Sequence, residues 1–454
     1  MSPYSVAVTT IHGASTALLT DHYELTMLQA ALRSGAAHRR CVFETFTRRL
    51  PEGRRYGVLA GTGRLLDAIA DFRFGEAEIA DLRARGVVDA QVCDWLAGYR
   101  FRGSIRGYAE GECFFPGSPV LVVEGSFAEA VVLETLVLSI LNHDSAIASA
   151  ASRMTTAAGD RPCIEMGSRR THEQAAVAAA RAAYIAGFAR TSNLEAGRRY
   201  GVPTTGTSAH SFTLLHDTEQ EAFRAQLDAL GPGTTLLVDT YDVAAAVATA
   251  VRLAGPQLGA VRLDSGDLLV QAYEVREQLD ALGAHDTKII VTSDLDEHAI
   301  AALAAAPVDG YGVGTALVTG SGHPTASMVY KLVAREGLDG RLEPVAKKST
   351  DKRSVGGNKW ALRRRGPHGH AEAEIVGIGG MPVDDGDDRA LIVDLVHNGE
   401  RVEHAEAGGD LEAARRRHRQ SVAELPRVAW QLQRGEVCIP TSYVTNGIVP
   451  AAEP

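Results

Sequence analysis

Between about residues 160 and 320 the sequence repeats one pattern, and this repeat constrains the fold more than any other feature. Each repeat has a short apolar run rich in β-branched residues, a polar or Gly-containing loop, and a stretch of helical length. The six apolar runs are residues 163–166, 202–205, 234–238, 260–263, 288–292 and 309–313. Six successive βα units predict a parallel sheet and favour a complete or partial barrel over an open, doubly wound sheet. No G-x-G-x-x-G motif follows an early strand, which disfavours a dinucleotide-binding fold.

The two ends of the chain have different patterns. Residues 1–125 contain a helical stretch and Gly- and aromatic-rich segments typical of short strands with turns, so we expect an N-terminal α+β lobe there. Residues 126–345 would form the α/β barrel and carry the active site. Residues 346–454 are first basic and Gly-rich and later contain a charged helix; we expect this C-terminal segment to pack on the N-terminal lobe.

The composition is that of an ordinary globular protein. The 454 residues are 45% hydrophobic and 22% charged, which excludes a disordered or fibrous chain. The net charge of −10 gives no reason to expect nucleic acid or an anionic membrane as a partner. Five scattered Cys residues contain no C-x-x-C pair, and the N-terminus has no secretory pattern. We therefore expect a cytoplasmic protein without a zinc site, a disulfide framework or a membrane span.

Polar residues follow each predicted strand. Because the loops after the strands of a parallel barrel converge on one face, these side chains should meet. After the first run, Thr171 and Gln174 have the spacing of a capping box, which would place Arg169 and Arg170 just before a helix N-terminus, where anions bind. The later runs supply Thr207, His210, Asp239, Asp242, Arg262, Asp264, Asp267, Ser293, Asp294, Gly312, Gly314 and Thr315.

Each of these residues also has a structural interpretation. A single His after a strand is more often structural than catalytic, and an Asp after a strand often caps the next helix. Adjacent Arg residues can be solvated, and G-x-G-T can be a tight turn. Their convergence at consecutive strand ends nevertheless suits a magnesium-bound sugar phosphate, because carboxylates, Arg and a Gly loop would share one rim. The residues alone indicate a phosphate-handling barrel enzyme.

Seven segments, in order along the chain, make the sequence resemble the nicotinate phosphoribosyltransferase family. They are TDHYELTM (20–27), FETFTRRLPEGRRYGVLAG (43–61), GSRR (167–170), GTSAHSF (206–212), VDTYDV (238–243), VRLDSGDL (261–268) and VGTALVT (313–319). The resemblance implies an irregular α/β barrel of the type II phosphoribosyltransferases, a second lobe built from both chain ends, and a homodimer with shared active sites.

The activity implied by the resemblance is transfer of phosphoribosyl from phosphoribosyl pyrophosphate to the ring nitrogen of nicotinate. The products would be nicotinate mononucleotide and pyrophosphate, in NAD biosynthesis, with ATP and Mg²⁺ as cofactors. By resemblance His210 is the residue phosphorylated by ATP. The same resemblance makes Asp239 and Asp264 holders of ribose hydroxyls or Mg²⁺.

The remaining roles are implied in the same way. Arg169 and Arg262 would supply positive charge to phosphate and substrate, Gly314 and Thr315 would cradle the 5′-phosphate, and Asp21 and Tyr23 would reach the pyridine ring from the neighbouring subunit. Further substrate-binding candidates are Arg170, Ser192, Asn193, Thr207, Ser293 and Asp294. The basic residues Lys348, Lys352 and Lys359 are either phosphate contacts or part of a solvated loop.

Two alternatives remain. A nicotinamide-specific relative would have an Asp in the position of TSN (191–193), where Ser192 and Asn193 carry no charge, so we prefer the acid as substrate. The second alternative is a non-catalytic protein that binds a sugar phosphate in its barrel. A Schiff-base aldolase is disfavoured because all six Lys lie at or after residue 288.

Overall fold

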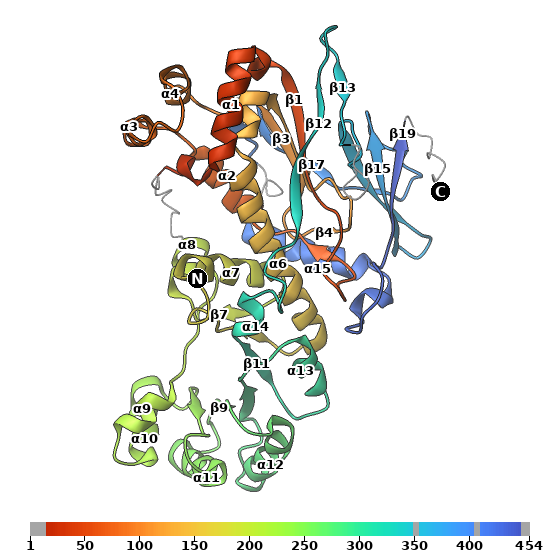
Figure 1. Ribbon diagram of the computed structural model, residues 1–454. Coiled ribbons are helices and arrows are strands. Elements are labelled where there is room, and N and C mark those ends of the chain that lie inside the picture. The colour runs from red at the N-terminus through yellow and green to blue at the C-terminus, as the bar shows by residue number, and fades with distance from the viewer. Residues whose placement is uncertain (1–14, 348–353, 404–408, 446–454) are drawn as a thin grey trace. The chain divides into compact units, whose positions relative to one another are not determined.

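The computed structural model describes residues 15–347, 354–403 and 409–445. The chain divides into two compact units (Figure 1). One, here the lobe, contains Met1–Ala146 and Thr325–Pro454, and the other, here the barrel unit, contains Ile147–Pro324. The limits at 147 and 324 differ from the expected 126 and 345.

The barrel unit is a six-stranded parallel sheet in the order β7-β6-β11-β10-β9-β8. Five of the six predicted strands are confirmed. The strands are β6 (Cys163–Glu165), β7 (Arg190–Thr191), β8 (Thr235–Leu237), β9 (Ala260–Leu263), β10 (Lys288–Val291) and β11 (Gly310–Val313). The helices after them are α7 (Glu173–Ile185), α8 (Leu194–Tyr200), α9 (His210–Leu215), α10 (Glu219–Leu230), α11 (Val243–Ala254), α12 (Leu268–Ala281), α13 (Glu297–Ala302) and α14 (Thr315–Val318).

The predicted strand at 202–205 is wrong as a full strand. This segment lies parallel to β7 through one bridge, between Thr204 and Thr191. Pro203 has no N–H to donate, so the ladder cannot extend there. The two-residue β7, which takes the place of the predicted strand in the sheet, is too short to show a period of two in the sequence.

The order of the strands is that of a barrel with one open seam. Within the barrel unit, the first strand in sequence, β6, pairs with the last, β11, so the sheet curls back on itself. Among the described residues, no ladder joins the 202–205 segment to β8, and the chain passes between them through α9 and α10. The partial barrel is therefore closed at β6 and β11 and open at the other side.

The lobe has two main sheets, to which both chain ends contribute. The larger has the order β13-β12-β1-β5-β3-β17-β18 and the smaller the order β16-β14-β15-β19. The larger contains β1 (Arg40–Thr47), β3 (Ser104–Tyr108), β5 (Leu121–Ser126), β12 (Met328–Glu336), β13 (Leu342–Pro344), β17 (Ile392–His397) and β18 (Glu400–Arg401). The smaller contains β14 (Lys359–Arg365), β15 (Ala371–Ile378), β16 (Arg389–Ala390) and β19 (Thr441–Thr445), and β2 (Gly57–Val58) pairs with β4 (Cys113–Phe114). Because β12 pairs with β1, and β17 with β3, segments from both ends of the sequence form one sheet.

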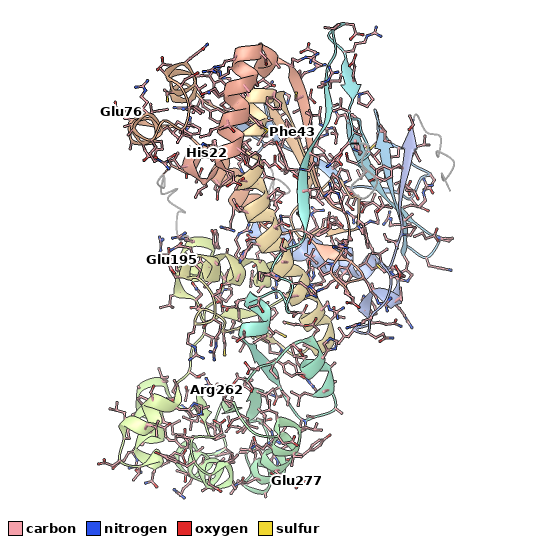
Figure 2. The ribbon with its side chains drawn as sticks, in the orientation of Figure 1. His22, Phe43, Glu76, Glu195, Arg262 and Glu277 are labelled. Atoms are coloured by element: carbon pink, nitrogen blue, oxygen red, sulfur yellow. The ribbon has the colours of Figure 1, made fainter. Side chains whose placement is uncertain are left out.

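Helices complete the lobe, and one of them continues into the barrel unit. They are α1 (His22–Ser34), α2 (Thr62–Ala70), α3 (Glu76–Ala84), α4 (Ala90–Ala97), α5 (Phe127–Val131), α6 (Glu134–Ala158) and α15 (Leu411–Glu424). Leu25 and Leu28 of α1 belong to the same buried cluster as Phe43 of β1, which Figure 2 labels. Phe43 stacks on Tyr330 of β12 with ring centroids 4.8 Å apart.

The long helix α6 explains why the unit limits differ from the expected ones. Its first half, with Leu136, Val137 and Leu141, belongs to the core of the lobe, and the helix continues past residue 146. Within the described residues, the stretch Phe127–Ala158 is long and apolar enough to cross a membrane by length and composition. Its most apolar window is 61% buried inside the protein, which is the behaviour of a core helix.

Candidate active site

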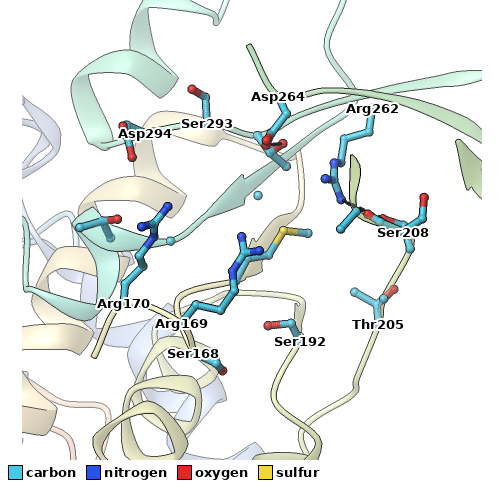
Figure 3. A pocket seen from close by; sticks show the side chains of 18 residues that line it. Ser168, Arg169, Arg170, Ser192, Thr205, Ser208, Arg262, Asp264, Ser293 and Asp294 are labelled. Carbon is cyan, nitrogen blue, oxygen red and sulfur yellow. Dashed lines mark hydrogen bonds between the residues drawn. The ribbon is translucent and has the colours of Figure 1, made fainter. Parts of the chain in front are cut away.

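A cavity of about 590 Å³ lies at the carboxyl ends of the parallel strands in the barrel unit (Figure 3). Loops after β6, β7, β9, β10 and β11 contribute to it, as the barrel pattern predicts. The lining residues are Met166, Ser168, Arg169, Arg170, Ser192, Thr205, Gly206, Thr207, Ser208, Ala209, Arg262, Asp264, Thr292, Ser293, Asp294, Gly312, Gly314 and Thr315. Most of the predicted strand-end residues therefore meet in space.

Three guanidinium groups give the cavity its positive charge. Figure 3 shows Arg169 and Arg170 on the loop after β6 and Arg262 on β9. Arg262 donates from Nη1 to Thr207 Oγ1 at 2.9 Å and to the Ser208 carbonyl at 3.2 Å. Burial lowers the pKa of Arg262, Asp264 and Asp239 oppose this change, and the nearby positive charge of Arg169 adds to it. Among the described residues none of the three forms an ion pair, so each guanidinium can pair with an anion in the cavity.

His210 begins α9 and is paired with a buried carboxylate. Its Nε2 lies 3.1 Å from Asp239 Oδ1, and the His210 side chain is 39% exposed while that of Asp239 is 2% exposed. The second oxygen of Asp239 accepts the Asp264 N–H and the Ser265 hydroxyl, both at 2.8 Å. Because a carboxylate accepts hydrogen bonds, this contact favours the tautomer with hydrogen on Nε2 and a lone pair on Nδ1.

The β10 and β11 side of the cavity has a constrained backbone. Ser293 has φ 125°, a conformation that costs a non-Gly residue free energy and that clusters at ligand sites. The Thr292 hydroxyl donates to Asp264 Oδ1. A Cβ at Gly312 would lie 2.5 Å from Thr292 Cγ2 and 2.8 Å from Met166 Sδ, so glycine is needed here for packing.

The comparisons with known proteins agree with this geometry. The model of the nicotinate phosphoribosyltransferase (NAPRTase) N-terminal domain matches residues 18–142. The chain is 59% identical over 436 residues to a Mycobacterium tuberculosis protein named nicotinate phosphoribosyltransferase pncB1, covering 94% of this chain and 95% of that protein. The chain belongs to the nicotinate phosphoribosyltransferase family.

Two further similar proteins have lower sequence identity to this chain. The nicotinate phosphoribosyltransferase of Bacillus subtilis is 36% identical over 384 residues, with 82% of this chain and 78% of that protein covered. The crystal structure of human nicotinic acid phosphoribosyltransferase has a TM-score of 0.79 at 26% identity and covers 93% of this chain and 97% of that chain. The predicted fold class, an irregular barrel of the type II phosphoribosyltransferases with a lobe from both chain ends, is confirmed.

Some residues that family resemblance indicates lie outside the cavity lining. Asp21 and Tyr23 belong to the lobe, at the start of α1, where Tyr23 is 45% exposed. Partial burial, with Glu134, Glu24 and Asp21 nearby, raises the pKa of Tyr23 to about 12. Asn193 caps α8, accepting the Ala196 N–H at 2.9 Å and donating to Ser168 Oγ at 3.0 Å. The substrate-binding roles of these residues stay predictions.

The structural interpretation is correct for several polar residues of the nicotinate phosphoribosyltransferase motifs. Asp242 and Asp267 accept N–H groups as the N-caps of α11 and α12. The capping box of Thr171 and Gln174 is wrong: α7 begins later, and its N-cap is His172, whose Nδ1 accepts the Gln174 N–H at 3.3 Å.

The prediction of a phosphate contact for Lys359 is also wrong. Lys359 is 1% exposed and donates to Glu44 Oε2 at 2.6 Å inside the lobe. The sequence around Lys359 is basic and Gly-rich, but the Lys359 ammonium pairs with a buried carboxylate on β1. Because β1 and β14 belong to different sheets, only the packing of the lobe shows this contact. Lys348 and Lys352 lie outside the described residues.

Magnesium would fit one side of the cavity. Asp264 lines it, and among the described residues its Oδ2 has no hydrogen-bond donor, whereas both oxygens of Asp239 are bonded to protein groups. The described residues that cluster as three metal-type ligands are Asp384, Asp385 and Asp388 in the lobe, not these two. Mg²⁺ at Asp264 would therefore need oxygens from substrate phosphates and water, which is its usual coordination in phosphate enzymes.

Sequence reasoning missed several cavity residues. Met166, Ser168, Thr205, Gly206, Ser208, Ala209 and Thr292 line the cavity and were not named. Ser168, Gly206, Ser208 and Ala209 lie inside the GSRR and GTSAHSF segments, so the motif itself was the signal that could have found them.

Proposed function

We propose that this protein transfers phosphoribosyl from phosphoribosyl pyrophosphate to nicotinate, giving nicotinate mononucleotide and pyrophosphate in NAD biosynthesis. The observation that carries the proposal is the set of three unpaired guanidiniums around Asp264 in the cavity of a chain 59% identical to a named nicotinate phosphoribosyltransferase. Both substrates are anions, and fixed positive charge in a partly enclosed site binds anions strongly.

The transfer step exchanges two bonds at one carbon. The ring nitrogen of nicotinate forms a bond to C1 of the ribose, and the bond from C1 to the pyrophosphate oxygen breaks with its electron pair leaving on pyrophosphate. Arg169, Arg170 and Arg262 would stabilise the carboxylate and phosphates, and Asp264 would hold Mg²⁺, which neutralises charge on the leaving group when bound. Ser192, Thr207, Ser293, Asp294, Gly314 and Thr315 line the same cavity and would contact the two substrates.

His210 would be the phosphoacceptor for ATP. Its Nδ1 carries the lone pair that attacks the γ-phosphorus, and the bond from that phosphorus to the β-phosphate oxygen breaks as ADP leaves. Asp239 holds the hydrogen on Nε2, so it orients the ring and stabilises the positive charge that forms on it. The Asp264 N–H and the Ser265 hydroxyl fix Asp239 in turn.

Labelled ATP tests this role. An acid-labile, base-stable phosphoprotein is expected, and His210→Ala should abolish the label while leaving slow, ATP-independent transfer, because chemistry at the anomeric carbon does not require the phosphohistidine. The matched control is His216→Ala, because His216 lies on the chain just after α9 and its Nδ1 contacts the Phe212 carbonyl at 2.9 Å. A folded His210→Ala enzyme that still hydrolyses ATP in step with product formation would contradict the mechanism.

A homodimer with shared sites completes the proposal. Asp21 and Tyr23 belong to the lobe and would approach the pyridine ring in the cavity of a second copy of the chain. Tyr23→Ala and His210→Ala proteins, each inactive in ATP-coupled transfer, should regain part of that activity after subunit exchange. Confirmed exchange without recovery would mean that both residues serve the same copy's site. The five free cysteines agree with the cytoplasmic location that we propose.

Steady-state rates with nicotinate and with nicotinamide, each measured with and without ATP, decide which pyridine is the substrate. Nicotinate should be used far better than nicotinamide, because an amide has no charge to pair with Arg169. Equal kcat/KM for the two would remove the preference for the acid. Binding of phosphoribosyl pyrophosphate without turnover of either pyridine would favour the non-catalytic alternative.

A further inference from the structure

Glu165 is a buried carboxylate beneath the cavity that the proposed reaction does not use. It is the last residue of β6 and is 0% exposed. Among the described residues it forms no ion pair, and burying a carboxylate without a cation is costly. Several other buried glutamates have a basic partner, among them Glu44 with Lys359, Glu112 with Arg389, and Glu297 with Arg153, whereas Glu24, like Glu165, accepts hydrogen bonds without an ion pair.

The two oxygens of Glu165 bind two different loops. Oε1 accepts the Gly167 N–H, and Oε2 accepts the Thr191 hydroxyl. The same Thr191 oxygen accepts the Asn193 N–H at 2.9 Å, and the Ser192 N–H donates to the Glu165 carbonyl at 2.8 Å. Burial raises the pKa of Glu165, and the two hydrogen bonds to its carboxylate oppose this increase.

These contacts fix the loop that carries Arg169 and the loop that carries Ser192. Gly167 has little freedom to move, since a Cβ there would lie 2.3 Å from Val318 Cγ1 and 3.1 Å from the Gly314 carbonyl oxygen. Arg169 follows Gly167 by two residues and Ser192 follows Thr191 directly, and both line the cavity. Glu165 itself does not line it.

We propose that Glu165, acting through Gly167 and Thr191, is a positioning residue that holds Arg169 and Ser192 in place for nicotinate. This inference rests on the proposed function. Because Glu165 does not line the cavity, its loss changes where the two loops lie and leaves His210, Asp239 and Asp264 in place. The effect therefore appears in the KM for nicotinate and not in kcat.

Three Thr variants test the inference. Thr191→Val keeps the shape of the side chain and removes the hydroxyl that Glu165 accepts, while Thr191→Ser keeps the hydroxyl. Thr287→Val is the matched control: Thr287 is 0% exposed, donates to the Leu258 carbonyl at 2.9 Å, and directly precedes β10, at the opposite end of the sheet from the cavity.

The expected result is a KM increase in one variant only. Thr191→Val should raise the KM for nicotinate about tenfold with kcat within about twofold of the original, and Thr191→Ser should restore the KM to within about twofold. Thr287→Val should lower the unfolding temperature comparably without changing the KM. If Thr191→Val fails to fold, Glu165→Leu, which removes both carboxylate acceptors in a side chain of similar size, should show the same KM increase.

Two results would overturn the inference. An unchanged KM in folded Thr191→Val or Glu165→Leu protein, or an equal KM increase in Thr287→Val, would show that Glu165 only supports the fold. Failure of the proposed function looks different, because the original protein would then not turn over nicotinate at all, and both proposals would fall together.

Discussion

The lobe and the rim of the barrel differ in how their charged side chains are paired. In the lobe, Glu112 lies 2.7 Å from Arg389 and Glu44 lies 2.6 Å from Lys359, so buried acids and bases neutralise each other. At the rim, Asp239 contacts His210, a backbone N–H and a hydroxyl, and the arginines of the cavity pair with no acid among the described residues. The comparison teaches that paired charges hold the fold, while separated charges remain available to a ligand.

The largest effect is expected from breaking the lobe's network at Glu112. Burial disfavours the charged carboxylate, yet Arg389 and Arg363 hold the pKa of Glu112 at about 2. Glu112→Gln removes the acid that Arg389 and Arg363 share, while Arg363 keeps Glu374 and Arg389 keeps Glu424, and it should cost about 3 kcal/mol of unfolding free energy. Trp95, Trp360 and Trp430 all lie in the lobe, so tryptophan fluorescence in urea reports on it. Less than about 1 kcal/mol of loss would mean that the network is dispensable.

The pH dependence of the lobe should come mainly from His418 on α15. Burial, with Arg415 and Arg419, lowers the pKa of His418 from 6.5 to about 4. The unfolded chain therefore takes up a proton near pH 6.5 and the folded lobe only near pH 4, so stability falls as the pH drops through this window, by about 3 kcal/mol.

Glu112 affects the stability of the lobe in a lower pH range than His418 does. Its stabilising contribution is complete above pH 4.5 and is lost as the pH falls toward 2, because its folded pKa lies below the ordinary value. His418→Gln should flatten the stability profile between pH 6.5 and 4 and leave the lower transition in place. Equal slopes for both proteins in urea titrations would contradict this assignment.

A smaller effect should distinguish two neighbours at the rim. Ser192 lines the cavity, whereas Asn193 caps α8 and does not line it. Ser192→Asp places a negative charge beside the nicotinate carboxylate and should raise its KM about tenfold, which corresponds to about 1.4 kcal/mol, and improve nicotinamide relative to nicotinate. Asn193→Asp keeps the cap and should change the preference less than about threefold. The opposite ranking would mean that residue 193 faces the ring.

The smallest effect compares two acids of the same loop. The Asp267 side chain is the N-cap of α12 and accepts the Val270 N–H at 3.2 Å. Asp267→Ala removes this cap and should cost about 1 kcal/mol of unfolding free energy, with activity retained. Asp264→Ala should instead raise the Mg²⁺ concentration needed for half-maximal activity. Magnesium titrations of both variants, with thermal unfolding, test the separation. A higher magnesium requirement in Asp267→Ala would contradict it.

Much of the site could be predicted because it depends on local pattern. Arg169, Asp264 and Ser293 follow apolar runs and Arg262 lies near the end of one. The parallel arrangement of those runs brings these residues to one end of the sheet. The roles of single polar residues were harder to predict. Asp242, Asp267 and Asp264 each follow a strand, and only the helix starts show that two of them are caps.

What the sequence by itself determined is the order of the elements, the parallel barrel, the family and the loops that form the cavity, because periodicity and motifs are properties of neighbouring residues. Only the tertiary structure decided which partner each charged or polar side chain has. Lys359 meets Glu44 across 315 residues, and Glu165 meets Thr191 across 26. Such contacts arise from strand pairing in the barrel unit and from packing between strands of different sheets in the lobe, so no local pattern encodes them. Burial then decides whether a charge is neutralised or remains available for a ligand.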